Sequence, residues 1–159
     1  MLLFFIQHIY FMKRIIEHRK FLGVDKTADL KELKTVYRNL MKEWHPDKFT
    51  DNEEARIDAE EKSKKLIEAY HFLVSVAPET IAQSEAQYNE TIASSQILHY
   101  SYEKNLLQLN FVDGSSYEYF GVPKTLYNKL CSSDAPARFC RRNIYNEFVY
   151  RKVSKAVEE

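Results

Sequence analysis

Apolar residues recur at helical spacing through the first half of the chain. At about 100° per residue, those between positions 30 and 44 fall on one face, which predicts an amphipathic helix. Asp29 precedes this helix as its expected N-cap, and Glu32 stands at the spacing of a capping box. A second helix is expected over about 54–76, with Pro78 just beyond its end. The expected inward positions are Leu30, Leu33, Tyr37, Leu40, Met41 and Trp44 in the first helix and Ala59, Ser63, Leu66, Ile67, Tyr70 and Leu73 in the second.

The first of these helices has to end at Pro46. Proline has no N–H, and its ring disfavours helical backbone angles at the preceding His45. About ten polar residues then lead to the second helix, which favours an antiparallel helical hairpin. A shorter helical stretch is expected to close the base of this hairpin. Its packing residues would be Ile15, Ile16, His18, Phe21 and Leu22.

A basic face adjoins the apolar stripe of the first predicted helix. Lys31, Lys34, Arg38 and Lys42 lie together on it, about 115° round from the stripe. Such a face is often only solvated. Here it leads directly to His45 and Asp47, which the proline keeps off the helix. The combination favours a surface that contacts another macromolecule.

The first twelve residues, MLLFFIQHIYFM, are unusually apolar. They lack the leading positive charge and the small-residue cleavage site of a secretory signal, and they are too short to span a bilayer. Met12 is followed by Lys13 and Arg14 and would make an ordinary start. The favoured interpretation is an over-long start or a mobile tail, and the alternative is a short membrane-surface or signal-like element.

The second half of the chain alternates between apolar and polar residues with period two. Asp113-Gly114 between two such runs is a strong hairpin signal, and residues 103–105 form a weaker turn before it. These runs predict a three-stranded antiparallel meander. A helix is expected after Pro123, and another from Asp134 onward. The apolar positions expected for the two helices are Leu126, Tyr127 and Leu130, and then Phe139, Cys140, Ile144 and Phe148.

The predicted fold class is therefore α+β with two small domains. The first is an all-α helical hairpin over residues 13–77, and the second is the meander with its two helices over residues 92–159. Residues 1–12 are the tail described above. Residues 78–91, PETIAQSEAQYNET, are polar without a large apolar face, so they form either a linker or a solvated helix.

Composition adds little to this picture. Lys plus Arg and Asp plus Glu are both 23, so any electrostatic signal has to be local. Two cysteines without a CxxC pair indicate a reducing compartment, taken to be the cytoplasm. The five histidines show no ligand spacing, so neither a metal nor another cofactor is expected.

The segments YRNLMKEWHPDKF and KSKKLIEAYHFL resemble the J-domain of DnaJ-type co-chaperones. The ending Phe21-Leu22-Gly23-Val24 of the first helix is also similar to that family, and the resemblance covers about residues 13–77. It implies a DnaK-type ATPase chaperone as partner, whose ATP hydrolysis the J-domain stimulates. It assigns the triggering loop to His45, Pro46 and Asp47, and the docking face to Lys34, Arg38 and Lys42.

Some positions depart from that family. Asn39 stands where many members have a basic residue, and Val36 and Met41 replace common alanines. The usual basic fourth helix is not recognisable, and the Gly/Phe-rich, zinc-finger and substrate-binding regions of general co-chaperones are missing from this sequence. The J-domain is therefore expected to carry a different second module, which would select the client.

The run FVDGSSYEYFGVPKTLYNKL and the later ARFCRRNIYNEFVYRKV resemble the KTSC domain. This module occurs alone in bacteria and at the C-terminus of some lysyl-tRNA synthetases; its activity is not established, and RNA binding has been suggested. Tyr117-Glu118-Tyr119 matches its central Tyr-x-Tyr, and Val122-Pro123 its Val-Pro. The family often has a glycine before the aromatic residue of its last helix and an Ile-Arg within that helix. This chain has residues 135–137 and Ile144-Tyr145 at those places.

A nucleic-acid interface is the alternative function. Arginines can hold phosphates while exposed aromatic rings stack on bases. Against it, residues 92–159 hold nine basic and seven acidic residues, a weak excess, and tyrosines in a meander are often core residues. The candidate contact residues, for RNA or for protein, are Tyr117, Tyr119, Arg138, Arg141, Arg142, Tyr145, Arg151 and Lys152.

An enzymatic function is not expected. The sequence shows no Ser-His-Asp context, no phosphate-binding glycine loop and no metal spacing. His45 and Asp47 could resemble an acid/base pair, but an exposed loop provides no pocket to tune their pKa values. They are interpreted as contact residues.

Overall fold

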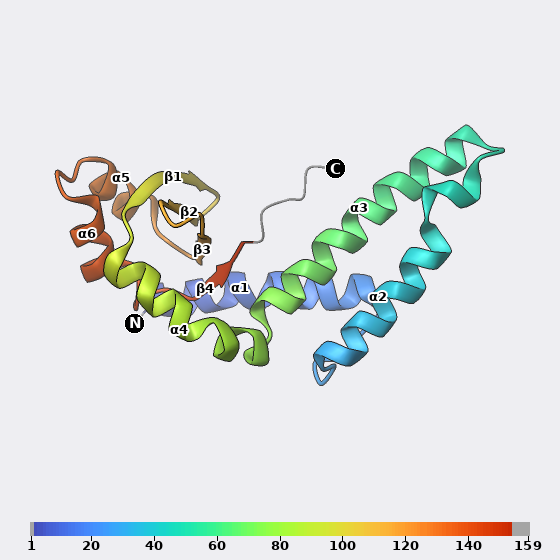
Figure 1. Ribbon diagram of the computed structural model, residues 1–159, viewed down its shortest axis with the longest axis horizontal. Helices are drawn as coiled ribbons and strands as arrows, with labels where there is room; N and C mark the ends of the chain where they lie inside the picture. Colours follow the sequence, from blue (N-terminus) through green and yellow to red (C-terminus); the bar gives the residue numbers. More distant parts are fainter. Residues whose placement is uncertain (1, 154–159) are drawn as a thin grey trace. The chain divides into compact units, whose positions relative to one another are not determined.

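The computed structural model describes residues 2–153, except for the side chains of residues 3, 4, 6 and 7. The chain divides into two compact units. One unit is formed by residues 13–77, and the other by the segment up to Met12 together with the chain from Pro78 onward. Figure 1 shows the helices and strands of the chain. Buried apolar residues occur in each unit.

The unit of residues 13–77 is a helical hairpin closed by part of a third helix. Helix α2 (Leu30–Trp44) and helix α3 (Glu53–Val76) run antiparallel and are joined through the 3₁₀ turn η1 (Pro46–Phe49) (Figure 1). The second half of α1 (Leu2–Leu22) completes the unit. The expected helical hairpin is confirmed. Its buried apolar residues are Ile15, Leu22, Leu33, Ala59, Leu66, Ala69, Phe72 and Leu73.

Three residues assigned to the interior of this unit are exposed. Ile16, Phe21 and Ile67 keep 57%, 39% and 38% of their surface in water, so their expected burial is wrong. The inward face of α3 instead includes Phe72, whose ring packs against His18 at 4.7 Å between centroids. Because α3 contacts α1 as well as α2, its buried face is rotated away from the stripe that a simple two-helix hairpin predicts.

The other unit contains an antiparallel sheet and helices. Its strands, in the spatial order β1-β2-β3-β4, are β1 (Ile97–Glu103), β2 (Leu106–Phe111), β3 (Ser116–Phe120) and β4 (Tyr150–Lys152). The expectation of three strands is therefore wrong by one. A strand of three residues is too short to show period-two alternation. It is defined by its pairing with β3, which a linear pattern does not reveal.

The two predicted turns hold the first three strands in register. Lys104 and Asn105 both adopt positive φ in the β1–β2 turn, at 49° and 62°. Between β2 and β3, the Asp113 carboxylate accepts hydrogen bonds from the Ser115 backbone N–H and hydroxyl, at 2.9 and 2.6 Å. Gly114 follows Asp113 with φ of 88°, a conformation that favours glycine. The Asp-Gly hairpin is confirmed.

The helices after the sheet are α5 (Lys124–Cys131) and α6 (Pro136–Asn143). Pro123 is the N-cap of α5, close to its expected place. The prediction that the second helix runs as far as Phe148 is wrong. The chain leaves helical angles at Ile144, and the N–H groups of Ile144 and Tyr145 both bond to the Cys140 carbonyl. This ending turns the chain toward β4 and buries Ile144 and Tyr145 in the core.

Helix α4 (Pro78–Ser94) covers the segment that the sequence predicted to be either a linker or a solvated helix. The segment is a helix. Helix α4 is not solvated all round, because Tyr88 and Thr91 are buried. Tyr88 belongs to the same apolar cluster as the strands of the sheet. Packing against the sheet, rather than an apolar stripe of its own, holds this helix in place.

Residues 2–12, which the sequence favoured as a tail, form the first half of α1. Phe11 packs against Phe120 of β3, with 4.9 Å between ring centroids. Over the residues that the structure describes, no helix combines the length and hydropathy needed to cross a bilayer.

Candidate functional site

The basic face predicted from the sequence lies on α2. Asp29 caps this helix, accepting a hydrogen bond from the Glu32 backbone N–H at 2.8 Å. Leu33 turns inward and is buried, whereas the cations on the other side are exposed. Within residues 2–153, no ion pair ties Lys34, Arg38 or Lys42 to a carboxylate. Their charge is therefore available to an acidic partner.

The loop that follows is open to water, with 51% of the His45 side chain and 89% of the Asp47 side chain exposed. His45 leaves the helix with φ −65° and ψ 129°, as expected for a residue before proline. Its carbonyl accepts the Lys48 N–H at 3.0 Å, which closes the turn.

The imidazole of His45 stabilises the turn through a hydrogen bond to the backbone of Asp47. Nδ1 accepts the Asp47 backbone N–H at 3.3 Å and lies 3.5 Å from the Asp47 carboxylate. Because Nδ1 accepts this hydrogen bond, the proton of the neutral ring is on Nε2. Nε2–H and the carboxylate of Asp47 can therefore offer a donor and an acceptor to another molecule.

Contacts with α3 fix the base of the loop. The Ser63 hydroxyl donates to the carbonyl of Trp44, the last residue of α2, at 2.9 Å. On the indole of Trp44, the ammonium of Lys62 lies 3.4 Å from the ring centroid. Tyr37 and Tyr70 stack between the two helices with centroids 4.2 Å apart. The end of α2 is thus held rigidly while the next residues remain exposed.

A hollow of about 820 Å³ lies beside the loop. The aromatic ring of Tyr37 and the side chain of Met41 supply apolar surface, and cations and an imidazole supply the polar groups. The sequence had assigned Tyr37 and Met41 only to packing, and both are in fact half-exposed. Lys48 was also missed, although it directly follows Asp47. The lining residues are Tyr37, Arg38, Met41, Lys42, His45 and Lys48.

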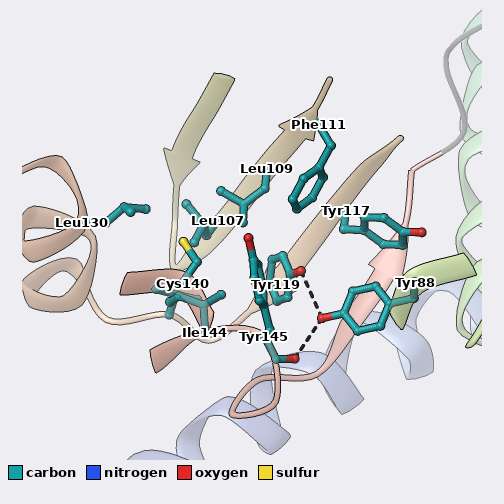
Figure 2. Close-up of a cluster of buried hydrophobic side chains, with 11 residues drawn as sticks. Tyr88, Leu107, Leu109, Phe111, Tyr117, Tyr119, Leu130, Cys140, Ile144 and Tyr145 are labelled. Carbon is teal, nitrogen blue, oxygen red and sulfur yellow. Dashed lines mark hydrogen bonds between the residues drawn. The ribbon is translucent and has the colours of Figure 1, made fainter. Parts of the chain in front are cut away.

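The candidate tyrosines of the C-terminal unit do not form a surface. Tyr117, Tyr119 and Tyr145 are at most 2% exposed and lie inside the apolar cluster (Figure 2). Burial raises the pKa of the Tyr119 and Tyr145 hydroxyls. The interpretation of these three rings as contact residues is wrong, because the inner face of the sheet and the turn after α6 place them in the core.

Tyr88 is a core residue of this unit that was not found from the sequence. Tyr88 of α4 donates its hydroxyl hydrogen to the Tyr145 carbonyl at 2.9 Å and lies 3.1 Å from the Tyr119 hydroxyl (Figure 2). The hydroxyl of Tyr119 is therefore the donor in that second bond. Burial raises the pKa of Tyr88. The residue stands in a polar segment, so no periodic signal marked it.

The basic candidates of the same unit fall into two groups. Arg151 of β4 pairs with Glu118 of β3 at 2.6 Å, with side chains only 14% and 11% exposed. Lys152 donates to the Gln87 amide oxygen at 2.7 Å. These two cations have internal partners. The exposed ones are Arg138, Arg141 and Arg142 on α6. Without exposed tyrosines among the candidates, the predicted nucleic-acid interface retains only these arginines.

Both predicted resemblances agree with matches to known families. Residues 17–81 match the DnaJ domain, and residues 93–148 match the KTSC domain. The chain is similar to the chaperone protein DnaJ of Thermoplasma volcanium, with 44% identity over 57 residues. It is also similar to the chaperone protein DnaJ of Fusobacterium nucleatum subsp. nucleatum, with 36% identity over 75 residues.

These similarities concern one part of each protein. The Thermoplasma match covers 36% of this chain and 15% of the relative, and the Fusobacterium match covers 46% and 18%. The chain thus spans less than a fifth of the length of these curated relatives.

Proposed function

We propose that this chain, which joins a DnaJ domain at residues 17–81 to a KTSC domain at residues 93–148, is a co-chaperone of a DnaK-type ATPase. In this proposal the helical unit binds the partner chaperone and stimulates its ATP hydrolysis. The C-terminal unit selects the client or ligand. The chain regulates the hydrolysis and contributes no catalytic group to it.

The observation that carries the proposal is the exposed loop at the end of the basic helix. Asp47 is almost fully exposed, and the cations of α2 have no internal ion pair among the described residues. A basic face by itself is often only solvated. Here it ends at an exposed loop, and this combination supports a contact with a partner.

The chemistry of the surface indicates what the partner should present. Lys34, Arg38 and Lys42 suit an acidic patch and would steer association, an effect that salt weakens. The hollow beside the loop adds apolar surface from Tyr37 and Met41. A partner segment with an apolar side chain next to carboxylates would fit both features.

The loop would act through its fixed shape. The Ser63 bond to the Trp44 carbonyl sets the direction in which the chain leaves α2. The Nδ1 bond of His45 then holds the imidazole against the turn. Little ordering remains to be done on binding, which favours affinity.

The proposed setting is the cytoplasm. Cys131 is exposed and Cys140 is buried, and both are free thiols. A reducing compartment is consistent with that state.

The test is steady-state ATP hydrolysis by a DnaK-type chaperone from the same organism, with and without the full chain. The variant His45→Gln is expected to lose the stimulation. Gln replaces the imidazole by a flexible amide that does not hold both the Asp47 N–H and an outward donor in the same geometry. Since the side chain is half-exposed, the fold should be retained.

A matched control is His99→Gln, which changes an exposed histidine of β1 outside the proposed surface. It should stimulate like the unchanged chain. Stimulation by His45→Gln equal to that of His99→Gln would refute the role of the loop. Absence of stimulation by the unchanged chain would refute the co-chaperone assignment itself.

A further inference from the structure

We propose that the first half of α1 is a reversible membrane-surface anchor that binds anionic lipid headgroups and inserts an apolar stripe beside them. The stripe consists of Leu2, Phe5, Ile9 and Met12, which are 80%, 71%, 57% and 37% exposed. Large apolar side chains exposed singly are ordinary on protein surfaces, but an ordered group of them marks a binding surface. This inference does not depend on the proposed chaperone function.

The four residues form a continuous face. Their spacing of three, four and three positions places them along one side of a helix. Phe11, which lies on the opposite side by the same geometry, packs against Phe120 of β3. The helix is thus attached to its unit by one face, and the apolar stripe is left facing water.

The described stripe is short compared with the thickness of a bilayer. Eleven helical residues from Leu2 to Met12 extend for about 15 Å, half of a hydrocarbon core. A helix that binds a membrane surface through one exposed apolar face lies in the interface, with its apolar side chains below the headgroups. Phe5 and Ile9 at the centre of the stripe would insert most deeply.

The charges indicate which kind of surface it fits. The sequence has no Asp or Glu before Glu17, whereas cations begin at Lys13, directly after the stripe. Lys13, the first residue after the stripe, is exposed and makes only a weak surface contact with Glu17 at 4.0 Å. A segment with local positive charge and no acid complements anionic headgroups.

A second copy of this chain is a poorer occupant. A stable protein interface buries about 800 Å² per partner, well above what four partly exposed side chains supply. Pairing two such helices in parallel would also bring like charges at Lys13 together. A lipid surface avoids both problems because it wraps the apolar side chains and supplies the opposite charge.

The experiment is co-sedimentation of the full chain with phosphatidylcholine vesicles, with and without phosphatidylglycerol, at low and at high salt. We expect binding to the vesicles that contain phosphatidylglycerol, weakened by salt. The double variant Phe5→Ser with Ile9→Ser should lower the partition coefficient about tenfold or more.

Leu98→Ser is the matched control, because Leu98 of β1 is 71% exposed and lies outside the stripe. It should leave the partition coefficient unchanged. The proposal is overturned if the double variant sediments like this control, or if the unchanged chain ignores phosphatidylglycerol. It is also overturned if light scattering shows a dimer that Ile9→Ser converts to a monomer, since the stripe would then bind a second copy. Trp44 fluorescence and tyrosine circular dichroism verify that each variant is folded.

Discussion

The substitution Tyr88→Phe tests whether α4 is an energetic part of the sheet-containing unit. It removes one oxygen atom and keeps the ring, so the stack on Tyr150, with centroids 3.8 Å apart, is retained. The loss is confined to two hydrogen bonds. One joins Tyr88 to the Tyr145 carbonyl, and the other joins it to the Tyr119 hydroxyl.

The size of the effect follows from burial. Tyr119 is 0% exposed and Tyr145 is 2% exposed, so water cannot replace the lost partner of either group. A buried polar group left without its partner costs about 1–3 kcal/mol. With two groups affected, we expect the free energy of unfolding of this unit to fall by about 2–6 kcal/mol.

The measurement is a urea titration of the full chain followed by tyrosine circular dichroism. The single tryptophan, Trp44, belongs to the other unit, and its fluorescence provides an internal reference. The transition of the sheet-containing unit should move to lower urea while the Trp44 transition stays in place. Tyr100→Phe is the control, because no hydrogen bond of its hydroxyl occurs within the described residues. It should change stability by less than about 0.5 kcal/mol.

Two results would refute this reasoning. If Tyr88→Phe destabilised the unit no more than Tyr100→Phe, the hydroxyl network would contribute nothing measurable. If the Trp44 transition moved equally, the effect of Tyr88 would not be confined to its own unit.

Two further outcomes are expected. Ser63→Ala should lower the free energy of unfolding reported by Trp44 by about 1 kcal/mol, because it removes the hydrogen bond to the Trp44 carbonyl. Thr35→Ala, on the exposed face of α2, should leave this free energy unchanged. Equal urea midpoints for the two variants would contradict this expectation. Burial raises the pKa of the Cys140 thiol from its ordinary value of 9.0 to about 12. The protonated thiol therefore contributes its full stabilisation of the folded state below pH 9.0, and this stabilisation is lost as the pH rises toward the pKa of the folded protein. Unfolding free energies measured from about pH 8 to pH 10 should fall at up to about 1.4 kcal/mol per pH unit, and less steeply in Cys140→Ala; identical slopes would exclude the thiol as the cause.

The sequence by itself determined the elements whose causes are local. Pro46 ends α2 because of its own ring, and Asp113-Gly114 makes the hairpin because glycine tolerates positive φ. The amphipathic stripe of α2 and the cations beside it follow from helical spacing alone. These local rules also predicted His45 and Asp47 on an exposed loop, whereas Lys48 and the roles of Tyr37 and Met41 beside it were missed.

Only the tertiary structure decided which residues those elements bury. A tyrosine in a strand can lie on a buried or on an exposed face of the sheet. Tyr117 and Tyr119 are in the core because other elements cover their face of the sheet. Tyr88 is buried although its neighbours in the sequence are polar, because it packs against the apolar residues of the sheet. The composition of α4 alone does not predict this contact. The short strand β4 exists only through its pairing with β3. Burial and pairing are relations between distant segments, so the local pattern of one segment does not contain them.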